Sequence, residues 1–120
     1  MMSLRRSIAG ANGAAAVAFA AFGAHALPAD LADRFRGAYA TGAEFHLVHA
    51  VLLAALAFSG EPRNSGTAFW LLLAGSATFA ASLYALALTA TGAFGAITPV
   101  GGVLMIAGWL MLARDGLRRR

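Results

Sequence analysis

Residues 7–27 read SIAGANGAAAVAFAAFGAHAL, and whether this apolar run is a retained membrane helix decides the fold. If the run spans a membrane, the chain has four spans. If Ala24-His25-Ala26 is instead a small-residue cleavage site, residues 1–26 are a signal peptide and three spans remain. The apolar core of a signal peptide is about 7–15 residues long, whereas this run approaches the full thickness of a membrane. Its length therefore favours a retained helix.

The composition of the whole chain is typical of a membrane protein. Of its 120 residues, 60% are hydrophobic and 12% are charged, against about a half and a quarter in soluble domains. The mean hydropathy is +0.72. There is no cysteine, which excludes disulfides and thiolate metal sites. Every positive charge is an arginine at the end of an apolar run, so membrane orientation explains the net charge of +4 better than nucleic-acid binding does. We expect a lipid bilayer as the environment and no nucleic acid as a partner.

Four apolar runs are long enough to cross a membrane as helices, which takes roughly 20 residues. They occupy residues 7–27, 44–59, 67–90 and 96–113, and the second can be extended backwards through residues 39–43. Long, unbroken runs rich in Ala and Leu favour helices over strands. We therefore predict an all-α fold, an integral membrane four-helix bundle that forms a single domain over residues 1–120.

The three connections between these runs differ in character. Residues 28–42 carry Leu31, Phe35 and Tyr39 at helical spacing, with charged residues opposite, which predicts a short amphipathic helix at the membrane interface. Residues 60–66, GEPRNSG, predict a polar turn. The third connection, residues 91–95, is so short that the third and fourth helices must form a tight antiparallel hairpin.

The arginines predict the orientation of the bundle in the membrane. Cytoplasmic loops carry an excess of Arg and Lys. With the N-terminus in the cytoplasm, only Arg34 and Arg36 lie outside, and the other arginines lie inside: Arg5, Arg6, Arg63, Arg114, Arg118, Arg119 and Arg120. We therefore expect both termini to be cytoplasmic.

In this topology the polar side chains gather in the outer half of the bundle, with every helix contributing. The candidate polar pocket consists of His25, His46, His49, Tyr84 and Thr98. His46 and His49 are three residues apart and share one face of the second helix, near its outer end. Glu44 lies two residues before His46, so we expect it to point elsewhere, toward the headgroups.

Two interpretations of these histidines stay open. They can be structural and tie helices together through hydrogen bonds worth about 0.6 kcal/mol each. They can instead form a ligand pocket, a metal site, a pair of haem ligands or a proton relay, since ionisable residues inside a membrane are functional candidates. Nothing in their spacing demands a metal or a cofactor, and we expect neither.

The glycines within the Ala-rich spans indicate close helix packing, because small residues let backbones approach each other in lipid. We expect this role for Gly13, Gly23, Gly75, Gly101, Gly102 and Gly108. We expect Trp70 and Trp109 to lie at the inner interface as part of an aromatic belt.

Three stretches of the chain, in this order and spacing, resemble one known family. They are FGAHAL at 22–27, EFHLVHAVLLA at 44–54 and SLYALALTATGAFGAITPVGGVLMIAGWLML at 82–112. The family is an uncharacterised group of small four-helix inner-membrane proteins, a domain of unknown function, that includes bacterial YgdD and YwdK. The resemblance covers nearly the whole chain, and residues 95–102 are its most specific part. It implies a retained first helix and a bacterial inner (plasma) membrane location, but no function.

One residue departs from the family pattern. The family usually has Gln where this chain has His46. This difference weakens any metal site built from three histidines and leaves His25 and His49 as the pair of the family type.

Three functions compete on the sequence alone. The first is a non-enzymatic accessory or assembly component of a membrane complex, with another membrane protein or a second copy as its partner. The second is a small transporter, channel or ligand-binding bundle that uses the polar pocket in the outer half. An enzyme is the least supported, because the sequence contains no recognisable nucleophile with a base, no paired catalytic carboxylates and no phosphate loop. We therefore expect no catalytic residues.

Overall fold

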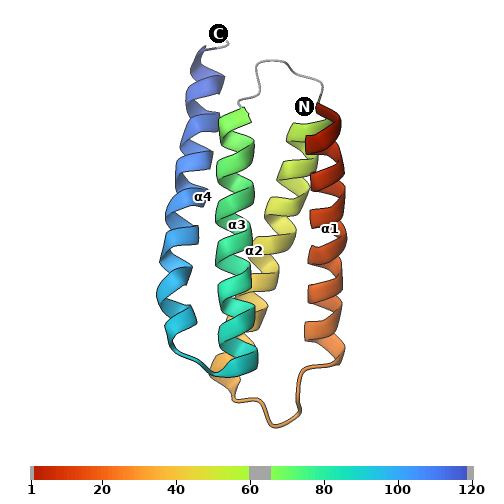
Figure 1. Cartoon of the computed structure of the whole chain (residues 1–120), viewed down its shortest axis with the longest axis vertical. Coiled ribbons are helices and arrows are strands. Elements are labelled where there is room, and N and C mark those ends of the chain that lie inside the picture. The colour runs from red at the N-terminus through yellow and green to blue at the C-terminus, as the bar shows by residue number, and fades with distance from the viewer. Residues whose placement is uncertain (1, 60–65, 119–120) are drawn as a thin grey trace.

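The computed structural model of the chain describes residues 2–59 and 66–118. Its regular structure is helical throughout these ranges: α1 (Met2–His25), α2 (Asp33–Phe58), α3 (Gly66–Thr89) and α4 (Ala93–Arg118) (Figure 1). Each of the four helices is long and apolar enough to cross a membrane. The predicted all-α four-helix membrane bundle is confirmed.

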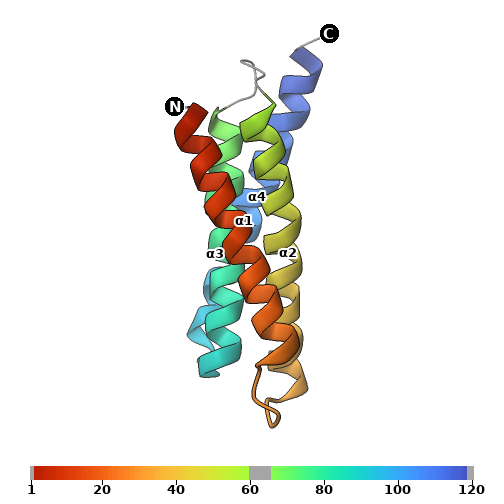
Figure 2. The ribbon, with the colours of Figure 1, turned by 90° about the vertical axis from the view of Figure 1, so that its right-hand side faces the viewer.

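Successive helices run antiparallel, so the start of α1 and the end of α4 lie at the same end of the bundle (Figure 1). We call this the terminal end, and we call the opposite end the loop end. Helices adjacent in sequence pack side by side, whereas the described parts of α1 and α4 make no close backbone approach. Seen from the side of α1, α2 and α3 form the middle of the bundle, with α1 in front of them and α4 behind (Figure 2).

The separate interfacial helix predicted over residues 28–42 is wrong. Residues from Asp33 onward are continuous with α2, and a short turn precedes them in which the Leu31 N–H donates to the Pro28 carbonyl. The helix continues through this segment because Tyr39 and Gly42 are buried in the bundle. As a result, α2 begins eleven residues before position 44, and the polar residues that follow are displaced toward its middle.

The connection between α3 and α4 is the tight hairpin that its length predicts. Ala90 follows the last residue of α3 and adopts the left-handed conformation, with φ of 53°. Its N–H donates to the Leu86 carbonyl at 2.8 Å, an arrangement that commonly ends a helix. Most of the polar turn predicted at residues 60–66 lies outside the described residues.

Glycines bring the backbones of α3 and α4 together. A Cβ added at Gly101 would lie 2.5 Å from the Phe79 backbone nitrogen, and one added at Gly75 would lie 2.7 Å from the Met105 nitrogen. A Cβ at Gly108 would meet the Leu72 side chain at 2.6 Å. The two helices can therefore sit this close only because these positions carry no side chain.

The other glycines expected to pack helices behave differently. A Cβ at Gly23 would meet the Tyr39 ring at 2.5 Å, so this position makes room for a side chain of α2. At Gly13 and Gly102 a Cβ would meet no atom within 4 Å, so the structure shows no close packing there. Gly42 was not among the expected positions, yet its Cβ would lie 3.1 Å from Leu83.

The buried apolar residues form two clusters, one toward each end of the bundle. Toward the terminal end the cluster consists of Ala9, Leu53, Ala57, Phe69 and Leu72. Toward the loop end it consists of Tyr39, Ala43, Ala80, Tyr84 and Ala87. The polar side chains expected to form a pocket lie beside and between these clusters.

Candidate functional site

His46 is a buried cross-link between three helices. Its side chain is 6% exposed, and its Nδ1 lies 3.0 Å from the Tyr84 hydroxyl of α3. Its Nε2 lies 3.1 Å from Asn12 Oδ1 of α1. A carbonyl oxygen can only accept, so Nε2–H donates to Asn12. In the neutral tautomer that carries this proton, Nδ1 accepts from the Tyr84 hydroxyl, and both ring nitrogens have partners.

His49 joins α2 to α4 through one of its two ring nitrogens. It is 4% exposed, and its Nδ1–H donates to the Phe45 carbonyl at 2.8 Å. Its Nε2 accepts from the indole N–H of Trp109 at 3.1 Å. The indole stands edge-on to the imidazole, at 78° between the rings. Trp109 was expected only in an aromatic belt, but it also reaches into the bundle and satisfies a buried ring nitrogen.

The remaining residues of the expected pocket lie elsewhere. The Thr98 hydroxyl pairs with the Ser82 hydroxyl at 2.6 Å, between α3 and α4. His25 ends α1 at the loop end and is exposed. The structure thus brings His46 and Tyr84 together, pairs His49 and Thr98 with other residues, and leaves His25 apart. The polar side chains form three separate pairs at different helix interfaces.

Metal binding has no support in this arrangement. Within the described residues, no group of three or more His, Cys, Asp or Glu side chains could hold an ion. The ring nitrogens of both buried histidines already have hydrogen-bond partners.

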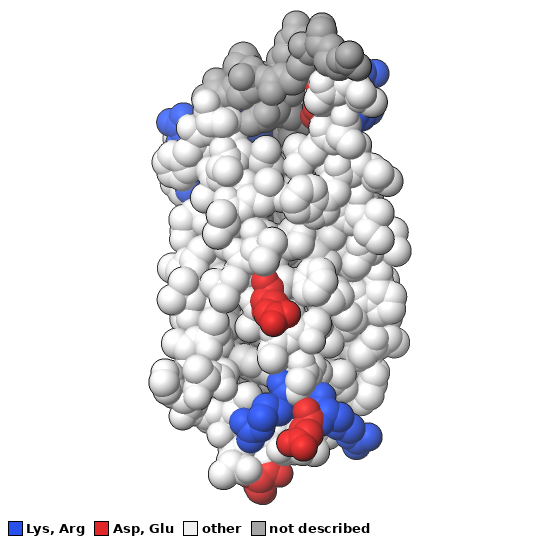
Figure 3. Space-filling view, turned by 180° about the vertical axis from the view of Figure 1, so that it is seen from behind, with Lys and Arg blue, Asp and Glu red and all other residues white. Residues whose placement is uncertain are grey.

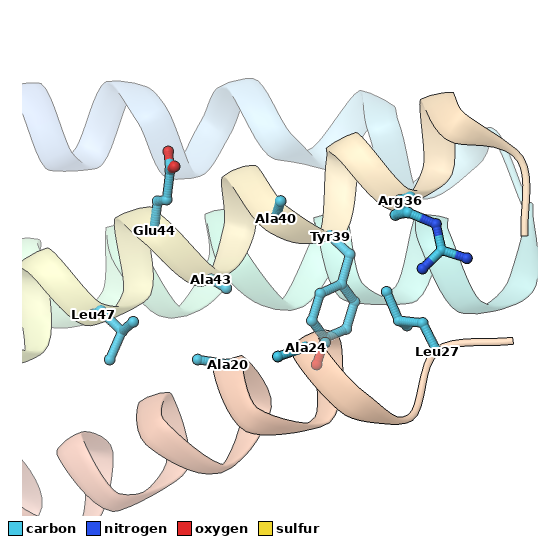
Figure 4. Close-up of a pocket in the computed structure, with 10 residues that line it drawn as sticks. Ala20, Ala24, Leu27, Arg36, Tyr39, Ala40, Ala43, Glu44 and Leu47 are labelled. Atoms are coloured by element: carbon cyan, nitrogen blue, oxygen red, sulfur yellow. The ribbon is translucent and has the colours of Figure 1, made fainter. Parts of the chain in front are cut away.

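A groove of about 300 Å³ runs between α1 and α2 toward the loop end (Figure 4). Its walls are apolar apart from three side chains, those of Arg36, Tyr39 and Glu44. The Tyr39 hydroxyl is not free, because it donates to the Phe19 carbonyl of α1 at 2.6 Å. Arg36 is turned toward the loop end, where it donates to the Pro28 carbonyl at 2.7 Å.

Glu44 lies farther along its helix than the sequence analysis placed it. It is the twelfth residue of α2 and is exposed on the outer wall of the bundle. Figure 4 shows its carboxylate pointing away from α1, on the rim of the groove. The sequence analysis gave the second span as residues 44–59, extendable backwards to residue 39, whereas α2 begins at Asp33.

The position of Glu44 along the bundle can be counted from the charged residues near its two ends. Arg36 lies near the loop end, and Arg6 donates to the Ala57 carbonyl at 3.2 Å near the terminal end. At 1.5 Å per residue these levels are about 32 Å apart along α2, close to the roughly 30 Å of a bilayer's hydrocarbon core. Glu44 is about 12 Å from the level of Arg36 and about 20 Å from that of Ala57. With the bilayer spanning these two levels, the Glu44 side chain emerges within the hydrocarbon.

The rest of the outer wall at this depth is apolar. Figure 3 shows an acidic side chain midway along an otherwise uncharged surface, with the other charges near the ends. Val48 and Val51 follow Glu44 on the same face and are 59% and 72% exposed. A charged side chain at the centre of a membrane helix costs about 3 kcal/mol. Within the described residues, the Glu44 carboxylate has neither a salt-bridge partner nor a hydrogen-bond partner to offset that cost.

Three important residues were missed or misplaced by sequence reasoning. Asn12 was not among the candidate residues, and Trp109 was expected only in an aromatic belt. The depth of Glu44 was assigned from the wrong helix start. The available signal was the rarity of Asn and Glu in such apolar runs, since polar residues within membrane spans pair with one another or mark functional sites.

Comparisons with known proteins agree with this architecture. A family model described as "Protein of unknown function (DUF423)" matches residues 19–102. The chain is 41% identical over 106 residues to the UPF0382 membrane protein YwdK of Bacillus subtilis, which covers 84% of this chain and 85% of that protein. No solved structure matches the chain.

Two further relatives extend the similarity to other bacteria. The UPF0382 membrane protein SH2409 of Staphylococcus haemolyticus is 44% identical over 94 residues, with 77% of each chain covered. The UPF0382 inner membrane protein YgdD of Escherichia coli K12 is 35% identical over 105 residues, which cover 85% of this chain and 80% of that protein.

Proposed function

The chain belongs to the family described as "Protein of unknown function (DUF423)", a multi-pass membrane protein like its relatives, and we propose that it is a non-enzymatic accessory or assembly component of a membrane complex. We further propose that it resides in the bacterial inner (plasma) membrane with both termini cytoplasmic. The terminal end carries Arg5, Arg6, Arg114 and Arg118, which supports that orientation.

The observation that carries this proposal is the way the buried polar side chains are used. His46, His49 and Ser82 each bond a side chain on another helix. These bonds join helices and occupy ring nitrogens and hydroxyl groups that a ligand inside the bundle would otherwise use. The features left for function are therefore on the outer wall, where a protein in the plane of the membrane can reach them.

The groove between α1 and α2 is the observation that favours the alternative, a ligand-binding or transport bundle. Its one mid-depth ionisable group, Glu44, is on the rim, and the Tyr39 hydroxyl inside it is already bonded to Phe19. A transport path needs polar groups along its length. The groove supplies few, so the accessory role has the stronger support.

Native mass spectrometry of the tagged full chain, released from its own membrane in polymer-bound lipid discs, tests the proposal. We expect a mass equal to the chain plus a second protein in a fixed ratio. The same tag on an unrelated four-span protein from that membrane sets the background of accidental co-release.

The other outcomes would overturn the accessory role. A chain that appears alone or only as multiples of itself, after background correction, has no stable partner. A chain that carries only the extra mass of a small molecule would support the ligand-binding alternative. In that case, narrowing the groove by Ala43→Leu should remove the extra mass, whereas Val51→Leu on the exposed wall should not.

A further inference from the structure

The exposed carboxylate of Glu44 identifies the kind of partner that the outer wall fits. We propose that α2 docks, through the face carrying Glu44, Val48 and Val51, against a transmembrane helix of a different protein, and that this helix places a Lys or Arg opposite Glu44. This inference rests on the proposed accessory function and names the partner's chemistry.

The first step is the depth of the carboxylate. Glu44 emerges about 12 Å below the level of Arg36 along α2, inside the hydrocarbon. At this depth water cannot solvate a carboxylate, and ionisable groups in membranes pair with each other or line a water-filled cavity. Figure 4 shows the carboxylate pointing outward from the bundle and not into the groove, so the pairing group has to come from outside.

The second step excludes pairing within the described chain. Arg36 is the nearest arginine along α2, and its guanidinium is bonded to Pro28 at the loop end. The two histidines of comparable depth, His46 and His49, are buried and use both ring nitrogens. Nothing in the described residues neutralises Glu44.

The third step excludes a second copy as the occupant. The described arginines lie in the end turns of the helices: Arg5 and Arg6 in α1, Arg34 and Arg36 in α2, and Arg114 and Arg118 in α4. A second copy lying in the same membrane therefore brings none of these arginines to the depth of Glu44. Charge complementarity requires a basic residue at mid-depth, which a different protein must supply.

The shape of this face of α2 allows another helix to pack against it. Val48 and Val51 lie one and two turns beyond Glu44 and are small, β-branched and exposed. Gly37 and Thr41 continue the same stripe toward the loop end and are also exposed. Small residues on one face allow another helix to approach closely in lipid, and Glu44 then fixes the register and the identity of the partner.

Site-specific photo-crosslinking of the full chain in its own membrane tests the inference. A benzophenone amino acid replaces Val48, one turn from Glu44, and the crosslinked peptide is sequenced. We expect a transmembrane segment of another protein with a Lys or Arg at the depth of Glu44. Glu44→Gln should lower the yield by about tenfold or more, because a buried ion pair loses one partner. The matched variant Val103→Gln places the same amide on the exposed wall of α4, outside the docking face, and should leave most of the yield.

A charge exchange completes the test. Glu44→Lys should abolish the crosslink, and Glu44→Lys combined with replacement of the partner's basic residue by Glu should restore it. A benzophenone at Val103, on the exposed wall of α4, serves as the control for a helix face outside the proposed docking surface. Crosslinks from position 48 only to lipid or to a second copy, or equal yields from Glu44→Gln and the unaltered chain, would overturn the inference.

Failure of this inference and failure of the accessory role give different results. If native mass spectrometry finds the partner on both the unaltered chain and Glu44→Gln, the accessory role stands and the docking face is elsewhere. If it finds no partner on the unaltered chain, the accessory role itself falls.

Discussion

Each buried imidazole described in this bundle has hydrogen-bond partners for both of its nitrogens, and at least one of those partners lies on another helix. His46 meets Tyr84 and Asn12, and His49 meets the Phe45 carbonyl and Trp109. Inside a lipid bilayer, no water is available to form a hydrogen bond with an unpaired donor or acceptor. These side chains therefore specify which helix faces meet.

This interpretation predicts a graded response at position 46. His46→Gln keeps a donor and an acceptor, so the free energy of unfolding should stay within about 0.5 kcal/mol of the unaltered chain. His46→Leu leaves Tyr84 and Asn12 without their partner and should cost about 1–2 kcal/mol. The measurement is unfolding by SDS in mixed micelles, followed by circular dichroism. Equal stability of the Leu and Gln variants would contradict a hydrogen-bonding role.

The sequence identified the polar residues but not their partners. His46, His49, Tyr84 and Thr98 were singled out because they are rare in apolar runs, but their expected convergence depended on helix rotations that no spacing encodes. In helices, side chains lean toward the N-terminus of their own helix. Tyr84 and Trp109 therefore reach about a turn from their own Cα levels, and sequence position alone does not show which histidine each will meet.

At the scale of the helix, the seam between α3 and α4 depends on a few positions without a Cβ. Gly101 lies against the backbone of Phe79, and Gly75 lies against that of Met105. Backbone atoms cannot move aside as a flexible side chain can. A methyl group at either position must push the helices apart along the seam.

A pair of neighbouring glycines gives a matched test of the seam. Gly101→Ala should lower the free energy of unfolding by about 1–3 kcal/mol, because its Cβ would lie 2.5 Å from the Phe79 nitrogen. Gly102→Ala, whose Cβ would meet no atom within 4 Å, should be neutral or slightly stabilising. SDS unfolding of both variants checks this. A Gly102→Ala cost as large as that of Gly101→Ala would show that helix propensity, and not contact, decides the outcome.

Helix number and type followed from the sequence, whereas the length of α2 did not. Hydropathy identified all four spans because each contains a long apolar window. The charges between Asp33 and Arg36 suggested a separate surface helix, but the backbone has no reason to break there. The helix continues through this segment, in which Tyr39 and Gly42 are buried against the bundle. That one boundary error placed Glu44 at the start of its helix in the sequence-based interpretation, whereas it is the twelfth residue of α2.

At the scale of the whole molecule, both described chain ends lie at one end of the bundle, and the arginines there are expected to face the cytoplasm. The chain contains no cysteine, so single cysteines report on this directly. Ala29→Cys, in the exposed loop-end connection, should react with an impermeant maleimide in intact cells. Ser3→Cys and Gly116→Cys should react only after the cells are opened. The reverse pattern would contradict the proposed orientation.

The attachment of α1 has a consequence for how this chain can diverge over time. Tyr39 donates to the Phe19 carbonyl and Arg6 donates to the Ala57 carbonyl, so α1 and α2 are bonded toward both ends through main-chain acceptors. A substitution can remove a side chain but not a main-chain oxygen. An exchange of the side chain at position 19 or 57 therefore leaves both acceptors in place, whereas the loss of Tyr39 or Arg6 removes one of these two bonds.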